Sequence, residues 1–137
     1  MNTVLAIDDD VILSELIRLT LQAPDRDVIT LNTGADALVR LSRTAPDLVL
    51  LDLELPDVQG LEILRHFREN PAWAETRIVI LTASHDLDNI IAAKTAGANG
   101  YICKPFQPET LNAMVTDILG QRDLVWLDDY TRSRKAS

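Results

Sequence analysis

The chain has 137 residues, of which 47% are hydrophobic and 25% are charged, a composition that fits one globular domain and excludes an intrinsically disordered body. Its formal net charge of −8 argues against direct nucleic-acid binding by the main body, because such surfaces concentrate Lys and Arg. No apolar run approaches the ~18 residues of a membrane helix, the first residues do not read as a signal peptide, and Cys103 has no second cysteine to pair with. We therefore expect a cytoplasmic protein that has no contact with a membrane.

Short apolar runs alternate with helical stretches five times along the chain. The apolar runs are Val4–Ile7, Val28–Leu31, Leu48–Leu51, Ile78–Leu81 and Tyr101–Cys103. The helical stretches that follow them are Val11–Leu21, Ala35–Leu41, Leu61–Phe67, Ile90–Ala96 and Pro108–Leu119. In the first of these, Ile12, Leu16 and Leu19 recur at helical spacing, which predicts a helix with an apolar stripe.

Strands that alternate with helices predict an α/β fold with a parallel sheet. The apolar runs do not alternate with polar residues, which indicates that helices cover both faces of the sheet. We expect a three-layer, flavodoxin-like sandwich of five helices and a five-stranded parallel sheet in the order 2-1-3-4-5. Right-handed crossovers then place the carboxyl ends of all strands at one edge, where ligands bind in such sheets.

Polar residues close these strands. Asp8, Asp9 and Asp10 follow the first strand, and Asp52, Thr82 and Lys104 close or follow the third, fourth and fifth. Crowded carboxylates repel one another, and a hard divalent cation such as Mg²⁺ or Mn²⁺ resolves this repulsion. A lysine and a hydroxyl beside such a cation suit a phosphoryl group. A carboxylate can accept that group as an acyl phosphate, and Asp52 in the middle strand is the candidate.

Five separated pieces of the sequence carry a family resemblance. They are VLAIDDD at 4–10, DLVLLDLELPDVQG at 47–60, IVILTA at 78–83, GANGY at 97–101 and KPF at 104–106. In this order and spacing the chain resembles, over residues 3–120, the CheY-like receiver domains of response regulators in two-component signal transduction. The resemblance implies a phosphorylation-dependent switch that catalyses only its own phosphoryl transfer and dephosphorylation.

The resemblance also implies roles for the acidic residues. Asp52 would be the phosphoacceptor and a ligand of Mg²⁺, together with the backbone carbonyl of Glu54. Asp9 would bind the metal directly, and Asp8 would hold it through water. The family varies at position 54, and a further hypothesis is that the Glu54 carboxylate contacts Lys104 in the resting state.

The remaining family positions concern the switch. By resemblance, Thr82 and Lys104 would meet the phosphoryl group, Tyr101 would turn inward when Thr82 moves, and Pro105 would follow a cis peptide bond. A sensor histidine kinase or phosphotransfer protein would be the donor. The face built from the last two helices and the fifth strand would bind a downstream protein or output domain. A homodimer linked to phosphorylation is a further alternative. Ser84 would tune the lifetime of the phosphoryl group.

Three other functions share parts of this pattern. Phosphatases that use an aspartyl phosphate have similar strand ends, but they carry a second Asp where this chain has Glu54. A binding module that has lost phosphorylation would not need the intact polar set. A flavin carrier of the same topology would have a hydroxyl-rich phosphate loop after the first strand, where this chain has Asp8–Asp10.

Several residues also have plain structural interpretations. Asp10 can cap the helix that follows it, Cys103 is expected to be a small buried residue, and Trp73 is expected to pack a loop. Tyr101 can pack in the sheet without switching anything. Residues 1–120 form the expected receiver domain, and residues 121–137 are either a helical extension or linker, or a frayed basic terminus.

Overall fold

A parallel β-sheet of five strands forms the centre of the computed structural model, which describes residues 1–83 and 87–120. The strands are β1 (Asn2–Ile7), β2 (Arg26–Leu31), β3 (Leu48–Asp52), β4 (Arg77–Thr82) and β5 (Gly100–Cys103). Their order is β2-β1-β3-β4-β5, as the sequence predicted. The predicted extension at 121–137 and the residues Ser84 and His85 lie outside the described part of the chain.

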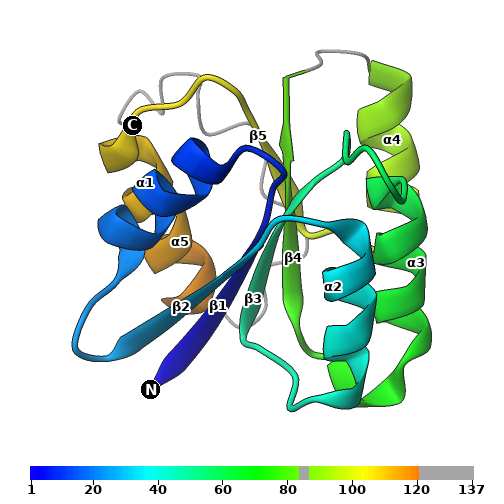
Figure 1. The fold of residues 1–137 in the computed structure, drawn as a ribbon, viewed down its shortest axis with the longest axis horizontal. Helices are drawn as coiled ribbons and strands as arrows, with labels where there is room; N and C mark the ends of the chain where they lie inside the picture. The colour runs from blue at the N-terminus through cyan, green and yellow to red at the C-terminus, as the bar shows by residue number, and fades with distance from the viewer. Residues whose placement is uncertain (84–86, 121–137) are drawn as a thin grey trace.

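Five α-helices cover the two faces of the sheet (Figure 1). They are α1 (Val11–Leu21), α2 (Gly34–Val39), α3 (Gly60–Glu69), α4 (Leu87–Thr95) and α5 (Pro108–Gly120). Two 3₁₀ turns, at Arg40–Ser42 and Pro71–Trp73, complete the described elements. None of the helices within residues 1–83 and 87–120 has the combination of length and apolar character that crossing a membrane requires.

The alternation of side chains along each strand builds two separate apolar cores. In β3, Leu48 and Leu50 point into the core under α1 and α5, whereas Val49 and Leu51 point into the core under α2, α3 and α4. All four of these residues are fully buried. This is why the strand is apolar throughout, and the three-layer expectation is confirmed (Figure 1).

Helix α1 forms where it was predicted, but it buries a different stripe. Ile17 and Leu21 are fully buried, whereas Ile12, Leu16 and Leu19 are 84%, 43% and 63% exposed. Both sets have helical spacing, so the periodicity alone did not decide which of them faces the sheet. The result is a helix with apolar residues on its outer side as well.

Two local predictions concern the loops and the helix ends. The Asp10 carboxylate accepts a hydrogen bond from the Leu13 N–H at 3.0 Å, so Asp10 caps α1. The α-helical part of α2 ends at Val39, and the chain continues as a 3₁₀ turn through Ser42. Trp73 is fully buried in the loop before β4 and stacks on Phe67, with ring centroids 4.6 Å apart. The expectation that Trp73 packs a loop is confirmed.

Candidate functional site

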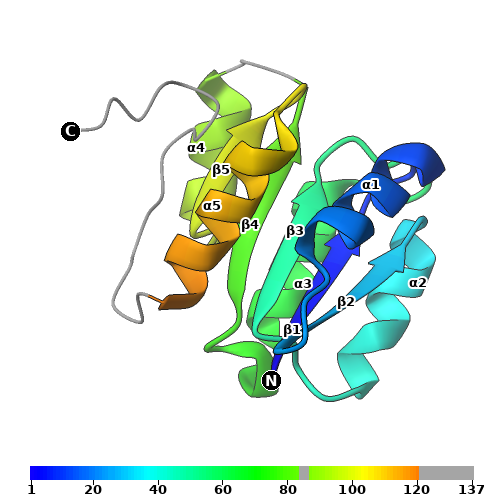
Figure 2. The ribbon, with the colours of Figure 1, turned by 90° about the vertical axis from the view of Figure 1, so that its left-hand side faces the viewer.

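The register of the sheet brings the polar strand ends to one edge (Figure 2). Ile7 of β1 pairs with Leu51 of β3, so that Asp8 emerges beside Asp52 in the next position. Across the other side of β3, Asp52 pairs with Leu81, one residue before Thr82. Hydrogen bonds between parallel strands therefore align the ends of segments that are far apart in the sequence.

Three carboxylates meet at this edge. One oxygen each from Asp8, Asp9 and Asp52 lie within 4.8 Å of one another. Asp8 is fully buried and Asp52 is 3% exposed, whereas Asp9 is exposed to solvent. The cluster is thus an acidic pocket with two buried walls and one open side.

Lys104 lies across the two buried carboxylates. Its Nζ atom is 2.7 Å from Asp8 Oδ2 and 3.4 Å from Asp52 Oδ2. Burial alone would lower the pKa of the Lys104 ammonium, but its close contact with the Asp8 carboxylate and the charge of Asp52 outweigh burial and raise this pKa. Lys104 is therefore charged and serves as the counter-ion of the two buried carboxylates.

The predicted contact between Glu54 and Lys104 is wrong. Among the described residues, the ion pairs of Lys104 within 4.0 Å are those with Asp8 and Asp52. The Glu54 side chain is exposed, and it is the Glu54 backbone that takes part in the site. The two buried carboxylates compete for the ammonium more effectively than an exposed one, because water screens them less.

The Asp52 carboxylate is held in place by the chain that follows it. The Glu54 N–H donates to Asp52 Oδ1 at 2.9 Å, which leaves Oδ2 on the side of Lys104. Burial raises the pKa of Asp52 above its ordinary value, although the Glu54 N–H and the Lys104 charge oppose this rise. Burial therefore makes the charged form of Asp52 more costly, and the Glu54 N–H and Lys104 offset part of that cost.

Two polar residues that the sequence analysis missed support the Asp8 backbone. The Asn32 Nδ2 atom donates to the Asp8 carbonyl oxygen at 2.8 Å, and the Ser14 hydroxyl donates to the same oxygen at 3.2 Å. Asn32 also donates to the Ser14 hydroxyl at 3.0 Å. Neither residue forms a recognisable motif with Asp8, and the only signal was a polar Ser14 on the buried face of α1.

The two predicted switch residues are both buried. Thr82 is 1% exposed at the end of β4, and Tyr101 is 8% exposed in β5, where it belongs to the core under α2, α3 and α4. Cys103 is 3% exposed, as expected of a small buried residue. The peptide bond between Lys104 and Pro105 is cis, as the resemblance implied.

The donor set of the pocket fits a hard divalent cation. Asp8 Oδ2 is buried and, within the described chain, accepts no hydrogen bond of normal geometry, although the Lys104 ammonium lies 2.7 Å away. Three ionised carboxylates and one ammonium carry a net formal charge of −2. Oxygen donors and an uncompensated negative charge are what Mg²⁺ selects.

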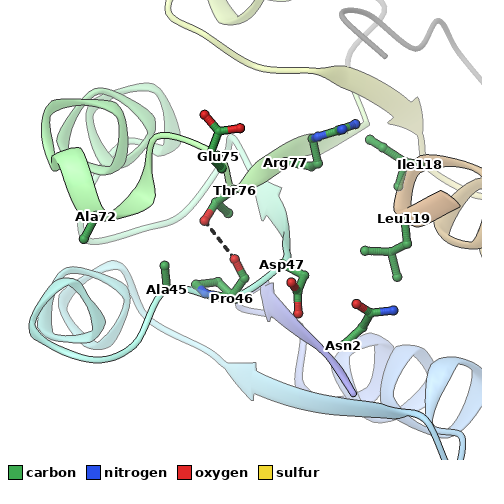
Figure 3. Close-up of a pocket in the computed structure, with 10 residues that line it drawn as sticks. All are labelled: Asn2, Ala45, Pro46, Asp47, Ala72, Glu75, Thr76, Arg77, Ile118 and Leu119. Carbon is green, nitrogen blue, oxygen red and sulfur yellow. Dashed lines mark hydrogen bonds between the residues drawn. The ribbon is translucent and has the colours of Figure 1, made fainter. Parts of the chain in front are cut away.

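A separate hollow of about 370 Å³ lies at the opposite edge of the sheet (Figure 3). Its walls include Asn2 at the start of β1, Arg77 at the start of β4 and Leu119 near the end of α5. The Thr76 hydroxyl, which donates to the Pro46 carbonyl oxygen at 2.8 Å, closes one side of it. The hollow lies where the strands begin, whereas the three carboxylates lie where the strands end. The hollow is therefore not part of the acidic pocket.

Comparison with known proteins identifies the family. Residues 4–116 match the model of the response regulator receiver domain. The chain belongs to this family. It is therefore a receiver domain of two-component phosphorelay signalling, with the acidic pocket of the family at Asp8, Asp9 and Asp52. The family consists of signalling switches and not of conventional enzymes, so neither the phosphatase nor the flavin carrier considered above is supported.

Relatives of known name agree with this assignment. The transcriptional regulatory protein TrcR of Mycobacterium tuberculosis is 36% identical over 116 residues, which are 85% of this chain and 44% of TrcR. The DNA-binding response regulator MtrA of Mycobacterium leprae is 37% identical over 120 residues, 88% of this chain and 52% of MtrA. The chain thus spans about half the length of these relatives.

Solved structures show the same fold. The BeF₃-activated receiver domain of DrrB, a Thermotoga maritima protein, superposes with a TM-score of 0.78 at 34% identity, covering 88% of this chain and 99% of that one. The chemotaxis response regulator CheY4 of Vibrio cholerae gives a TM-score of 0.80 at 30% identity, covering 86% and 98% of the two chains. The CheY-like fold predicted from the sequence is therefore confirmed.

Proposed function

We propose that this receiver domain accepts a phosphoryl group on Asp52 in a Mg²⁺-dependent reaction and passes the signal on through a change in its binding surface. The observation that carries the proposal is the contact of one lysine, Lys104, with two buried carboxylates beside a third, at the end of the central strand. Such a group has the charges that phosphoryl transfer requires, already in place.

Each side chain has a defined role in this proposal. Asp52 Oδ2 attacks the phosphorus of a phosphohistidine, so that a P–O bond forms, the P–N bond breaks and the imidazole of the donor leaves. The Glu54 N–H holds Oδ1 and thereby aims Oδ2. The Lys104 ammonium then pairs with a phosphoryl oxygen, and the Thr82 hydroxyl donates to another.

The metal would be held by Asp8, Asp9, Asp52 and the backbone carbonyl of Glu54. Mg²⁺, or Mn²⁺ in its place, supplies positive charge to the phosphoryl oxygens during transfer. The protein contributes the fixed positions of these donors, with Asp8 set by the Asn32 and Ser14 hydrogen bonds to its carbonyl oxygen.

A histidine kinase or phosphotransfer protein in the cytoplasm would be the donor, and α1 offers it a docking surface. Val11, Ile12, Leu16 and Leu19 are 65%, 84%, 43% and 63% exposed, and the stripe begins directly after the acidic residues of the pocket. An exposed stripe of neighbouring apolar side chains is typical of a surface that another protein covers. A donor on this stripe would bring its phosphohistidine to Asp52.

The output would leave from the opposite side of the pocket. Movement of Thr82 towards the phosphoryl group and of Tyr101 behind it would shift an existing equilibrium of the surface formed by α4, β5 and α5. A downstream protein, an output domain or a second copy of this domain would recognise that surface. Relatives named as DNA-binding or transcriptional regulators support an output of this kind. The receiver itself, with a net charge of −8, would make no direct contact with nucleic acid.

Intact mass after incubation with acetyl phosphate and Mg²⁺ tests the central step. We expect a single phosphoryl adduct on the wild type, and no adduct without Mg²⁺ or on Asp52→Asn. The matched control is Asp36→Asn, which removes an equal charge from an exposed position on α2 and leaves the adduct intact. An adduct that survives in Asp52→Asn would overturn the assignment.

The docking surface is tested separately. Ile12→Asp is expected to slow transfer from a phosphohistidine protein and to leave labelling by acetyl phosphate unchanged. Val39→Asp changes another exposed apolar residue, which lies on α2 and is 64% exposed, and serves as the control. Equal loss in both variants, or loss with acetyl phosphate as well, would contradict docking at α1.

A further inference from the structure

The loop between β3 and α3, residues 53–59, is fixed at its base by its own backbone. The Gly60 N–H donates to the Leu53 carbonyl oxygen at 3.1 Å, and a Cβ atom on Gly60 would lie 2.5 Å from the Asp52 carbonyl oxygen. Leu55 is 7% exposed and anchors the loop in the core. The Glu54 backbone, a proposed metal ligand, therefore sits between two anchored residues.

The outer end of the same loop is tied to a different element. Both oxygens of the Asp57 carboxylate accept hydrogen bonds from the first turn of α2: Oδ1 from the Gly34 N–H at 2.8 Å and Oδ2 from the Ala35 N–H at 3.0 Å. These donors have no partner within the helix, so an anionic acceptor suits them. The hydrogen bonds from Gly34 and Ala35 hold the pKa of Asp57 below its ordinary value.

The start of α2 and the loop that carries Asp57 approach each other closely at Gly34. A Cβ atom on Gly34 would lie 2.7 Å from the Val58 Cβ and 3.0 Å from Asp57 Oδ1, closer than side chains normally approach. Helix α2 also has its own cap, because the Thr33 hydroxyl accepts from the Asp36 N–H at 3.0 Å. The start of α2 is therefore capped by Thr33 even without Asp57. The specific effect of Asp57 is to hold the loop between β3 and α3.

The stretch 32–35 contacts both halves of the proposed metal site. Asn32, at its start, donates to the Asp8 carbonyl oxygen at 2.8 Å, and Gly34 and Ala35, at its end, hold Asp57. Asp8 and the Glu54 loop are separated by more than forty residues in the sequence, yet both form hydrogen bonds with this one short segment.

We propose that Asp57 is a positioning residue of the phosphorylation site: by bonding to the start of α2, it fixes the loop that presents the Glu54 carbonyl opposite Asp8 and Asp9. The proposal rests on the proposed function in that the site takes Mg²⁺. Without the two hydrogen bonds, the loop samples more positions and the cation must order it on binding, which weakens binding.

The test compares Asp57→Ala with Thr33→Ala, each of which removes one side-chain cap of α2. The Mg²⁺ dissociation constant is measured by NMR titration of the backbone amides, without any phosphoryl donor. For Asp57→Ala we expect Mg²⁺ affinity to fall about tenfold, the low end of the loss typical of outer-shell partners. Hydrogen exchange should accelerate at the Gly34, Ala35 and Glu54 amides. Asp57→Asn keeps one acceptor oxygen and should fall between Asp57→Ala and the wild type.

Thr33→Ala should leave Mg²⁺ affinity at the wild-type value, because it weakens α2 without releasing the loop. The proposal is overturned if Asp57→Ala binds Mg²⁺ as the wild type does, or if Thr33→Ala loses as much affinity as Asp57→Ala. If the wild type itself binds no Mg²⁺, both this proposal and the Mg²⁺-dependent function fail. If the wild type binds Mg²⁺ and Asp57→Ala binds it equally well, only the positioning role fails.

Discussion

Replacement of Lys104 by Met tests the view that this lysine is the counter-ion of the acidic pocket. The substitution keeps the length and apolar stem of the side chain and removes the charge that lies 2.7 Å from Asp8 and 3.4 Å from Asp52. At an effective dielectric constant of about 20, attractions over these distances amount to ~6 and ~5 kcal/mol before desolvation is counted.

Most of that attraction offsets the cost of burying the three charges. Removal of one partner of a buried ion pair lowers stability by about 3–5 kcal/mol. The Lys104 side chain is 20% exposed, so water screens it in part and the lower end applies. We therefore expect Lys104→Met to lower the free energy of unfolding by about 3 kcal/mol in EDTA at neutral pH, which moves the urea midpoint down by ~2 M for a typical slope.

A comparison with and without Mg²⁺ tests whether the loss of stability in Lys104→Met comes from repulsion among the carboxylates. A cation that binds only the folded state stabilises it, and it binds the variant more tightly because the competing ammonium is gone. Urea titrations in saturating Mg²⁺ should therefore show a smaller loss than titrations in EDTA. The control is Lys94→Met, which removes an equal charge from an exposed position on α4. A loss of equal size in EDTA and in Mg²⁺, or one no larger than that of the control, would refute the reasoning.

Three further outcomes follow from the packing and the hydrogen bonds. Gly60→Ala should lower the free energy of unfolding by about 1–3 kcal/mol in urea titrations, because its Cβ would overlap the Asp52 backbone at 2.5 Å. Trp73→Ala should lower it by about 3–5 kcal/mol and reduce the melting temperature, since a fully buried ring stacked on Phe67 is lost. Asp57→Asn should be less stable than the wild type at neutral pH, and the difference should vanish as the pH falls. The pKa of Asp57 is depressed in the folded state, so its stabilisation is present above the ordinary value of 3.8 and lost as the pH falls through the folded value; a difference that is constant with pH would contradict this.

The fold was predictable because two independent signals agreed. Five runs of β-branched and aliphatic residues specified buried parallel strands, and the handedness of their connections left one common edge for their polar ends. The outer face of α1 was not predictable in the same way. Ile12, Leu16 and Leu19 fit the helical period as well as Ile17 and Leu21 do, and only packing against β-strands and α5 selects one stripe.

The part of the site that was predictable from the sequence is the part in which binding a metal ion requires carboxylates. The three carboxylates of Asp8, Asp9 and Asp52 do converge, since each one closes or follows a strand at the same edge. The contact of Glu54 with Lys104 was wrong because a sequence does not show that a fully buried carboxylate lies nearer. Supporting contacts were missed for a related reason.

Those missed contacts are hydrogen bonds between side chains and the backbone of distant segments. Asn32 bonds to Asp8 across 24 positions, and Asp57 bonds to Gly34 across 23. Any short polar side chain can make such a bond, so the residue type carries little information about its partner. Their placement becomes visible only when β1, β2 and β3 lie side by side.

The charge balance of the pocket links the resting contacts to the proposed reaction. In the resting pocket, the Lys104 ammonium offsets one of three carboxylates, which leaves a net charge of −2 when all three are ionised. A divalent cation would bring that total to zero and release the ammonium from its role as counter-ion. An arriving phosphoryl group is itself an anion, and it would then find in Lys104 a cation that is already desolvated and held beside Asp52. The same lysine can thus stabilise the pocket before and after phosphorylation, and a single substitution at Lys104 should impair both forms.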